Sequence, residues 1–144
     1  MQRQNAYFEK DVPGVGRFTL RMLEVPDDIP LVHRWVTHER AKYWGMQRQS
    51  VDDVESAYRE ILRQPGSFVF LGFHDDEPAF LLERYCPTAD VVGRCYDARP
   101  GDRGMHILVA PTDRPIAQFT WHVFTAVMDC LFSDDTVARI VVEP

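Results

Sequence analysis

The sequence predicts a single α/β domain in which helices cover a central sheet. Residues 18–22 alternate between apolar and polar side chains, the period of a half-buried strand. Apolar residues from Val54 to Ile61 recur at i, i+3, i+4 and i+7, the spacing of an amphipathic helix. Two apolar runs, 67–73 and 79–85, flank a polar turn and so predict a hairpin. With 144 residues, the chain is long enough for one core but not for two.

The remaining elements follow from local signals along the chain. Asp27-Asp28 before Pro30 predicts a helix start, with Ile29, Val32 and Trp35 on one face. Ser50 and Asp53 form a capping box for the second helix, which Pro65-Gly66 ends. Further on, the pattern predicts a functional loop at 87–104, a strand at 105–110, a helix at 115–132 and a strand at 139–142. The predicted order is therefore β-α-α-β-β-β-α-β.

Composition and charge exclude several classes of protein. No apolar run approaches the roughly 18 residues that cross a membrane. The polar residues 1–5 do not resemble the start of a signal peptide, so we expect a cytoplasmic protein with no membrane partner. The net charge of −6 argues against a nucleic-acid partner, which would need a clustered basic face.

The metal-binding residue types are too scattered to predict a metal site. Cys86, Cys95 and Cys130 contain no Cys-x-x-Cys unit, which favours three reduced thiols over a disulfide framework or a zinc site. The histidines at 33, 38 and 74 do not share a helix face or a ligand spacing.

The most informative stretch runs from Tyr96 to Ala110 and continues through residues 111–115 into the last predicted helix. It places His106 on a short apolar strand that leads to a helix N-terminus, a natural anion site. An imidazole with an ordinary pKa near 6.5 suits a general base at neutral pH. From the residues alone, a structural histidine whose ring nitrogens have hydrogen-bond partners is favoured over a catalytic one.

Several short motifs in this order resemble one family, the GNAT-superfamily N-acyltransferases of hydroxamate siderophore biosynthesis, which acylate N-hydroxylated lysine, ornithine or cadaverine. The matching residues extend over nearly the whole chain: Arg17-Phe18-Thr19-Leu20-Arg21, His33-Arg34-Trp35, Tyr43-Trp44, Glu83-Arg84-Tyr85, Tyr96 to Val109 and Val141-Val142-Glu143-Pro144.

The resemblance implies a GNAT fold with a mixed central sheet, an acetyl-CoA or other short acyl-CoA as co-substrate, no metal, and His106 as the catalytic residue. The family pairs this histidine with an aspartate just after Glu-Pro, a position that would follow Pro144. Glu143 is a candidate substitute, although a structural role at a strand end is favoured for it. The N-hydroxylated acceptor is less basic than an alkylamine, so His106 would only need to accept the proton released as the adduct forms.

The carrier is expected to bind where backbone N–H groups at the start of the last helix can meet its pyrophosphate. The residues assigned to this site are Leu108, Val109, Ala110, Arg114, Ile116, Ala117 and Gln118. The segment lacks the glycines of the Arg-x-x-Gly-x-Gly loop that many GNAT proteins carry, which implies an altered hold on the carrier. Arg114 suits a phosphate partner and a solvated charge equally well.

For the acceptor, the expected residues are Trp44, Glu83, Tyr85 and Asp102. Trp44, beside a glycine, is a better pocket residue than Trp35, whose helical spacing suggests the core. Glu83 or Asp102 would meet an ammonium end, and a carboxylate in the apolar strand of Glu83 is costly unless paired. Strand alternation turns Arg84 to the opposite face.

Two other functions remain open: a GNAT enzyme acting on an ordinary amine, and a binding or assembly module that has lost catalysis. In the family, another helix and one or two strands would follow. Residues 1–144 are thus expected to form one GNAT-like domain that is truncated, continues beyond this sequence, or is a reduced relative. We also expect the edge of the last strand either to pair two copies into a homodimer or to be completed by a segment that this sequence does not contain, because open edges are usually paired or covered.

Overall fold

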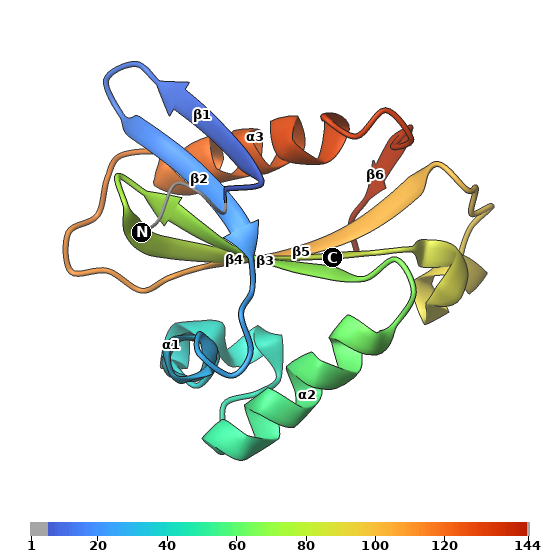
Figure 1. Cartoon of the computed structure of the whole chain (residues 1–144), viewed down its shortest axis with the longest axis horizontal. Coiled ribbons are helices and arrows are strands. Elements are labelled where there is room, and N and C mark those ends of the chain that lie inside the picture. Colours follow the sequence, from blue (N-terminus) through green and yellow to red (C-terminus); the bar gives the residue numbers. More distant parts are fainter. Residues whose placement is uncertain (1–5, 144) are drawn as a thin grey trace.

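The computed structural model describes residues 6–143, which form a six-stranded sheet with helices on both faces (Figure 1). The strands are β1 (Phe8–Val12), β2 (Gly16–Met22), β3 (Phe68–His74), β4 (Glu77–Tyr85), β5 (Asp102–Val109) and β6 (Arg139–Val141). They lie in sequence order across the sheet, and neighbours are antiparallel except for β5 and β6, which are parallel. The predicted mixed sheet is confirmed.

The helices divide between the two faces of the sheet. Figure 1 shows α1 (Ile29–Val36) and α2 (Val51–Arg63) on one side and α3 (Phe119–Phe132) on the other. Three short 3-10 helices lie between these elements: η2 (Glu39–Trp44), η3 (Pro87–Ala89) and η4 (Val91–Arg94). The predicted capping box of α2 is present, with Ser50 Oγ accepting from Asp53 N at 3.1 Å and the Asp53 carboxylate accepting from Ser50 N at 3.0 Å.

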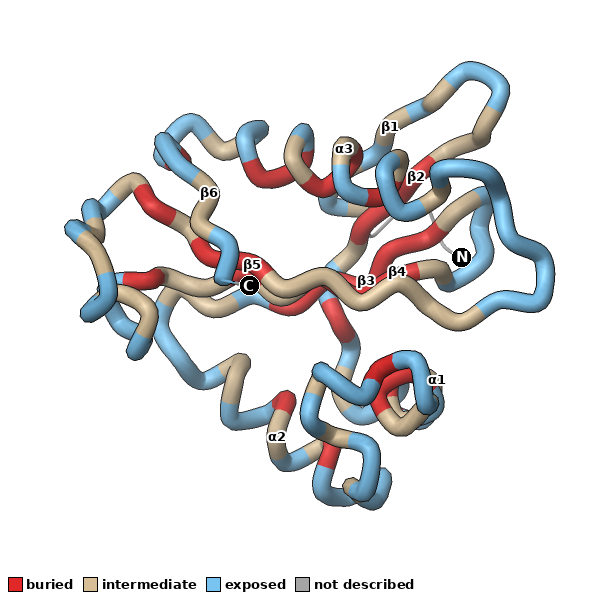
Figure 2. Tube along the Cα trace, turned by 180° about the vertical axis from the view of Figure 1, so that it is seen from behind, coloured by how far each residue is buried: buried red, intermediate tan, exposed pale blue. Residues whose placement is uncertain are grey.

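A separate apolar core lies on each face of the sheet. Along β3, Val69, Leu71 and Phe73 belong to the core under α1 and α2, whereas Phe70 belongs to the core under α3. Because both faces of β3 and β4 are covered, these strands read as continuous apolar runs instead of alternating ones. Figure 2 shows the buried residues concentrated along the strands and on the sheet-facing sides of the helices.

Three features of the strands differ from the sequence prediction: an additional strand, the length of the hairpin turn and the start of β5. Strand β1 was not predicted, because its charged residues 9–11 hide the alternation of an edge strand. The hairpin turn is tighter than residues 74–78, since Asp75 and Asp76 adopt φ of 48° and 68° and close a two-residue turn. Strand β5 begins at Asp102, inside the segment predicted as loop.

The fourth difference affects the predicted carrier site. Helix α3 begins at Phe119 and not at Pro115, because Gln118 adopts a left-handed backbone conformation with φ of 58°. A left-handed residue interrupts the right-handed helical ladder, so residues 115–118 lie outside the helix, and residues 117 and 118 form a turn that leads into it.

The free edge of β6 and the lengths of the helices relate to two expectations from the sequence, a homodimer and the absence of a membrane partner. Within residues 6–143, β6 has β5 as its strand neighbour on one side, and the pairing of two copies through its other edge stays a prediction. No helix in this range is both long enough and apolar enough to cross a membrane.

Candidate functional site

His106 is held from one side by Glu83 on the neighbouring strand. The antiparallel register of β4 and β5 places the two residues directly opposite each other. Nδ1 of His106 lies 3.2 Å from Oε1 of Glu83, whose side chain is only 14% exposed. The other carboxylate oxygen, Oε2, accepts a hydrogen bond of 2.7 Å from the hydroxyl of Tyr58 on α2. Glu83 is therefore paired through both oxygens, as a carboxylate in an apolar strand requires.

Glu143 contacts the other ring nitrogen of the same histidine. Its Oε1 lies 2.9 Å from Nε2 of His106, and its side chain is 47% exposed. The carboxylate of Glu143 thus points at the imidazole, which is where the alternative of a substitute acid would place it, and its role stays a prediction.

The two carboxylates change the charge of the imidazole. The hydrogen bond to Glu83 is the largest cause that raises the pKa of His106 to about 9, with Glu143 adding to the rise and burial opposing it. The expectation of an ordinary pKa near 6.5 is therefore corrected. A pKa raised in this way favours the imidazolium at neutral pH, and in that form both ring nitrogens are proton donors and neither can accept a proton.

Two aromatic side chains enclose the imidazole. The ring centroid of Tyr85 lies 5.2 Å from that of His106, and Trp44 meets it edge-on at 6.1 Å. Tyr85 can lie here because Gly104 is opposite it on β5, where an added Cβ would come within 2.1 Å of the tyrosine ring. The Tyr85 hydroxyl donates to Glu143 at 3.4 Å, and burial is the main cause that raises the pKa of Tyr85 to about 12.

The structure therefore brings together His106 and three of the four predicted acceptor residues, Trp44, Glu83 and Tyr85, but not Asp102. The side chain of Asp102 is 1% exposed and is occupied by Arg139, Tyr96 and the backbone of Arg99. It cannot meet an ammonium group without breaking these contacts. Arg84 pairs with Asp134 just after α3, on the opposite face, as strand alternation predicts.

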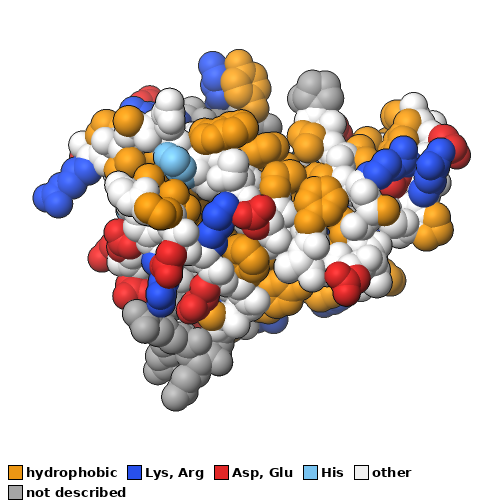
Figure 3. Space-filling view, turned by 90° about the horizontal axis from the view of Figure 1, so that it is seen from above, with side chains coloured by type: hydrophobic (Ala, Val, Ile, Leu, Met, Phe, Trp, Pro, Cys, Tyr) orange, Lys and Arg blue, Asp and Glu red, His pale blue; other side chains and the backbone are white. Residues whose placement is uncertain are grey.

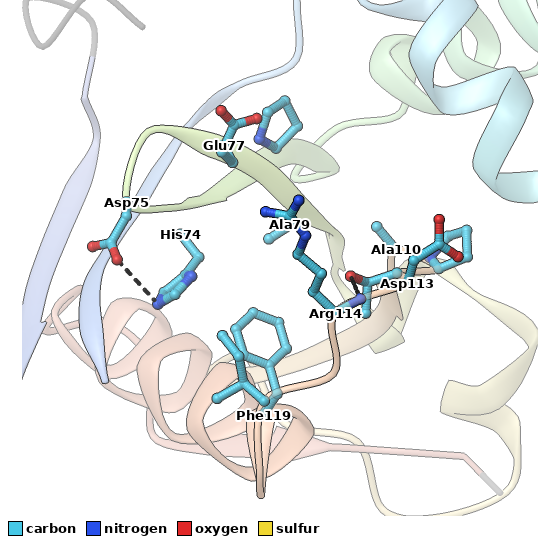
Figure 4. A pocket seen from close by; sticks show the side chains of 12 residues that line it. His74, Asp75, Glu77, Ala79, Ala110, Asp113, Arg114 and Phe119 are labelled. Atoms are coloured by element: carbon cyan, nitrogen blue, oxygen red, sulfur yellow. Dashed lines mark hydrogen bonds and ion pairs between the residues drawn. The ribbon is translucent and has the colours of Figure 1, made fainter. Parts of the chain in front are cut away.

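A separate cavity of about 570 Å³ lies at the end of β5, beside the segment predicted to hold the carrier (Figure 4). Ala110, Arg114 and Ile116 line it, whereas Leu108, Val109, Ala117 and Gln118 are not among its lining residues. Figure 4 shows the Arg114 side chain extending from its loop across the cavity toward Ala79 on β4. Three lining carboxylates, Asp75, Glu77 and Asp113, share the cavity with this guanidinium.

The start of α3 fits an anionic group better than the cavity as a whole does. Helices expose unpaired N–H groups in their first turn, and no side chain caps α3 at Gln118. The N–H of Arg114 is occupied, because it donates to Thr112 Oγ1 at 3.0 Å. Anion binding would therefore depend on the backbone of α3 and on the Arg114 guanidinium.

Sequence comparison decides the family. The model of the acetyltransferase (GNAT) domain family matches residues 24–144. The chain belongs to the GNAT acetyltransferase family. This match confirms the predicted fold class and the predicted class of enzyme domain, an acyl-CoA-dependent acyltransferase.

One relative of this GNAT domain is the N(6)-hydroxylysine O-acetyltransferase of Escherichia coli, which is 28% identical to it over 144 residues. The alignment covers 98% of this chain but only 45% of that protein. The GNAT domain thus corresponds to about half of this relative.

Solved structures share the fold at low sequence identity. An uncharacterized protein from Bacillus halodurans matches with a TM-score of 0.86 and 19% identity, over 99% of this chain and 74% of that one. Aminoglycoside acetyltransferase AAC(6')-Ib, solved with paromomycin and acetyl-CoA, matches with a TM-score of 0.76 and 22% identity, over 88% and 73%. Spermidine N-acetyltransferase from Vibrio cholerae, solved with CoA and spermine, gives 0.65 and 17%, over 87% and 69%.

Sequence reasoning missed one member of the site of this GNAT domain. Tyr58 was interpreted only as a core residue of its helix, and it is fully buried, but its hydroxyl binds Glu83 and accepts from Trp44 Nε1 at 3.4 Å. The available signal was a tyrosine on the apolar face of a helix together with a glutamate in an apolar strand, since each needs a buried polar partner.

Proposed function

We propose that this GNAT domain transfers an acetyl or other short acyl group from coenzyme A to an N-hydroxylated diamine or amino acid, a step in hydroxamate siderophore assembly. The sequence motifs support this acceptor class, and so does the Escherichia coli relative, whose name gives N(6)-hydroxylysine as its acceptor. The observation that carries the proposal is the position of the His106 imidazole between the carboxylates of Glu83 and Glu143, which favours its protonated form.

The charge of His106 discriminates between acceptors. An alkylamine with a pKa near 10.4 arrives as an ammonium ion and must lose a proton before it can attack. An imidazolium cannot accept that proton, and a carboxylate such as Glu143 is a far weaker base than an alkylamine, so it would not take the proton from the ammonium ion before the attack. An N-hydroxylamine arrives neutral, because its oxygen withdraws electrons, and it can attack without prior deprotonation. The site therefore favours the N-hydroxylated acceptor.

His106 and Glu143 can together move the protons of the transfer. As the acceptor nitrogen bonds to the thioester carbonyl carbon, Glu143 takes the proton that this nitrogen loses. As the carbon–sulfur bond breaks, His106 Nε2 gives its proton to the sulfur that leaves. The proton on Glu143 then passes to His106 across their 2.9 Å contact and restores the starting state. Glu83 holds the ring in place through Nδ1 throughout.

Strand β5 links this proton-transfer site to the segment that would hold the carrier. His106 and Ala110 are four residues apart, about 13 Å along an extended strand. The carrier supplies an activated thioester, and its phosphates would lie near Arg114 and the start of α3 while its acyl end reaches His106. The fit is incomplete at the cavity, where three carboxylates would disfavour an anion.

The proposal is tested with matched acceptors. Rates of thiol release from acetyl-CoA are measured at pH 7.5 with N-hydroxycadaverine against cadaverine, and with N6-hydroxylysine against lysine. We expect kcat/KM to be at least about tenfold higher for the hydroxylated member of each pair. General acid–base assistance contributes about a hundredfold or more, so a difference of this size is within its reach. Equal rates, or a preference for the plain amine, would overturn the acceptor assignment.

The ordinary amine remains the second candidate, because Glu143 places a half-exposed carboxylate where a cation can reach it. The same paired assay decides between the two. A domain that binds coenzyme A but releases no thiol with any of the four acceptors would instead be a binding module.

A further inference from the structure

Two pairs of residues repeat with the same spacing across the parallel strands β5 and β6. Asp102 is opposite Arg139, and Gly104 is opposite Val141. His106 lies four residues after Asp102, and Glu143 lies four residues after Arg139. Because parallel strands advance equally and side chains alternate with period two, a shift of four residues brings the second pair together on the same face. The contact between His106 and Glu143 is observed there.

The first pair is the best-anchored contact between these strands. Arg139 Nε and Nη2 donate to the two carboxylate oxygens of Asp102, each at 2.7 Å. Asp102 is buried and also accepts from the Tyr96 hydroxyl at 2.7 Å and from the Arg99 N–H at 3.0 Å. A two-pronged guanidinium–carboxylate pair fixes both distance and orientation, which a lysine cannot do.

Glu143 lies two residues past the end of β6, and this strand has little else to fix its register. Strand β6 has only three residues, and its ladder with β5 spans three residue pairs. A slip by one residue would move Glu143 by about 3.3 Å along the strand and turn alternate side chains to the other face. The contact of 2.9 Å with His106 would then be lost.

We propose that Asp102 and Arg139 are positioning residues, which set the register of β6 and thereby place the Glu143 carboxylate on Nε2 of His106. The effect of this positioning on acyl transfer rests on the function proposed above, but the positioning itself can be tested without substrate. Asp102 lies four residues before His106, about 13 Å along an extended strand, so the pair need not touch the reacting atoms.

The test measures the pKa of His106 by NMR titration in the whole chain, without ligands. Arg139→Gln and Glu143→Gln should lower this pKa from about 9 to similar values, because both remove the Glu143 contact. The sign is decisive, because loss of a nearby positive charge acting only through space would raise the pKa. In a Glu143→Gln background, Arg139→Gln should have no further effect.

Arg103→Gln is the matched control, since Arg103 lies next to Asp102 on β5 but its guanidinium donates only to the backbone oxygens of Pro100 and Asp102. It should leave the His106 pKa unchanged. If Arg139→Gln does not fold, as judged by circular dichroism, Arg139→Lys replaces it. The lysine keeps the positive charge but cannot donate to both oxygens of Asp102 at once, so it should also lower the pKa of His106.

An unchanged or raised pKa in a folded Arg139 variant, or a further decrease on the Glu143→Gln background, would overturn the positioning role. Because no step of this measurement uses an acceptor or acetyl-CoA, a domain that proves inactive leaves its outcome intact. In an active domain, the Arg139 variants should also shift the basic limb of the kcat/KM profile to lower pH, by the same amount as the His106 pKa.

Discussion

Nδ1 of His106 lies 3.2 Å from Oε1 of Glu83, the residue directly opposite it on the neighbouring strand. This pair, with Glu143 on the second ring nitrogen, determines how the imidazole is charged and which proton it can give.

Replacing His106 with alanine should lower turnover about a hundredfold or more, the amount that a positioned acid–base group contributes. The fold and the affinity for coenzyme A should change little, because the side chain is 38% exposed and lies away from the Arg114 segment. Steady-state kinetics and calorimetric titration with coenzyme A measure the two effects. His122→Ala on α3 is the control histidine. Near-normal turnover in His106→Ala would remove this residue from the mechanism.

Glu83→Gln should lower the pKa of His106, because the hydrogen bond to Glu83 is the largest cause of its rise. The ring keeps its contact with Glu143, so we expect a pKa between about 6.5 and 9. An NMR titration of the imidazole protons measures it. Glu60→Gln, on the exposed side of α2 with Arg63, is a control that should leave the titration unchanged. A His106 pKa of about 9 in Glu83→Gln would contradict the assigned cause.

The pH dependence of acyl transfer should follow the protonated form of His106. With a pKa raised to about 9, the imidazolium persists through neutral pH and is lost as the pH rises through this value. With an N-hydroxylated acceptor, kcat/KM should therefore be level near pH 7.5 and fall above about 9. A histidine that acts as a base would produce the opposite limb, with the rate increasing toward pH 9.

Arg114→Ala should weaken coenzyme A binding by about 1 kcal/mol, the value of one exposed charge contact. The reason for this small effect is that the backbone at the start of α3 supplies the other donors and that nearby carboxylates offset the guanidinium. Calorimetric titration measures the loss, with Arg63→Ala on α2 as the control. Complete loss of binding would show that the side chain, and not the helix start, holds the phosphates.

One surface of the domain has no part in these predictions. Trp121 and Phe124 stack on the outer side of α3 with their ring centroids 6.1 Å apart, and their side chains are 61% and 36% exposed. Figure 3 looks onto this side of the molecule and shows hydrophobic side chains spread across it.

The sequence by itself determined the elements whose signals are local. The Ser50 and Asp53 capping box starts α2 as predicted, and the apolar runs on either side of residues 74–78 form a hairpin. The motif around His106 placed the histidine on a strand that leads to the segment predicted to hold the carrier. Each of these features depends on a few consecutive residues, whose backbone preferences and side-chain periodicity are visible without the rest of the chain.

Only the tertiary structure decided which residues surround His106. Glu83 reaches it through the register of β4 and β5, Glu143 through the register of β5 and β6, and Tyr58 through the packing of α2 on the sheet. The burial of Asp102 and the raised pKa of His106 follow from the same long-range pairing. Register and burial depend on contacts between segments far apart in the chain. The local periodicity of a strand does not determine which residues of a neighbouring strand will lie opposite it.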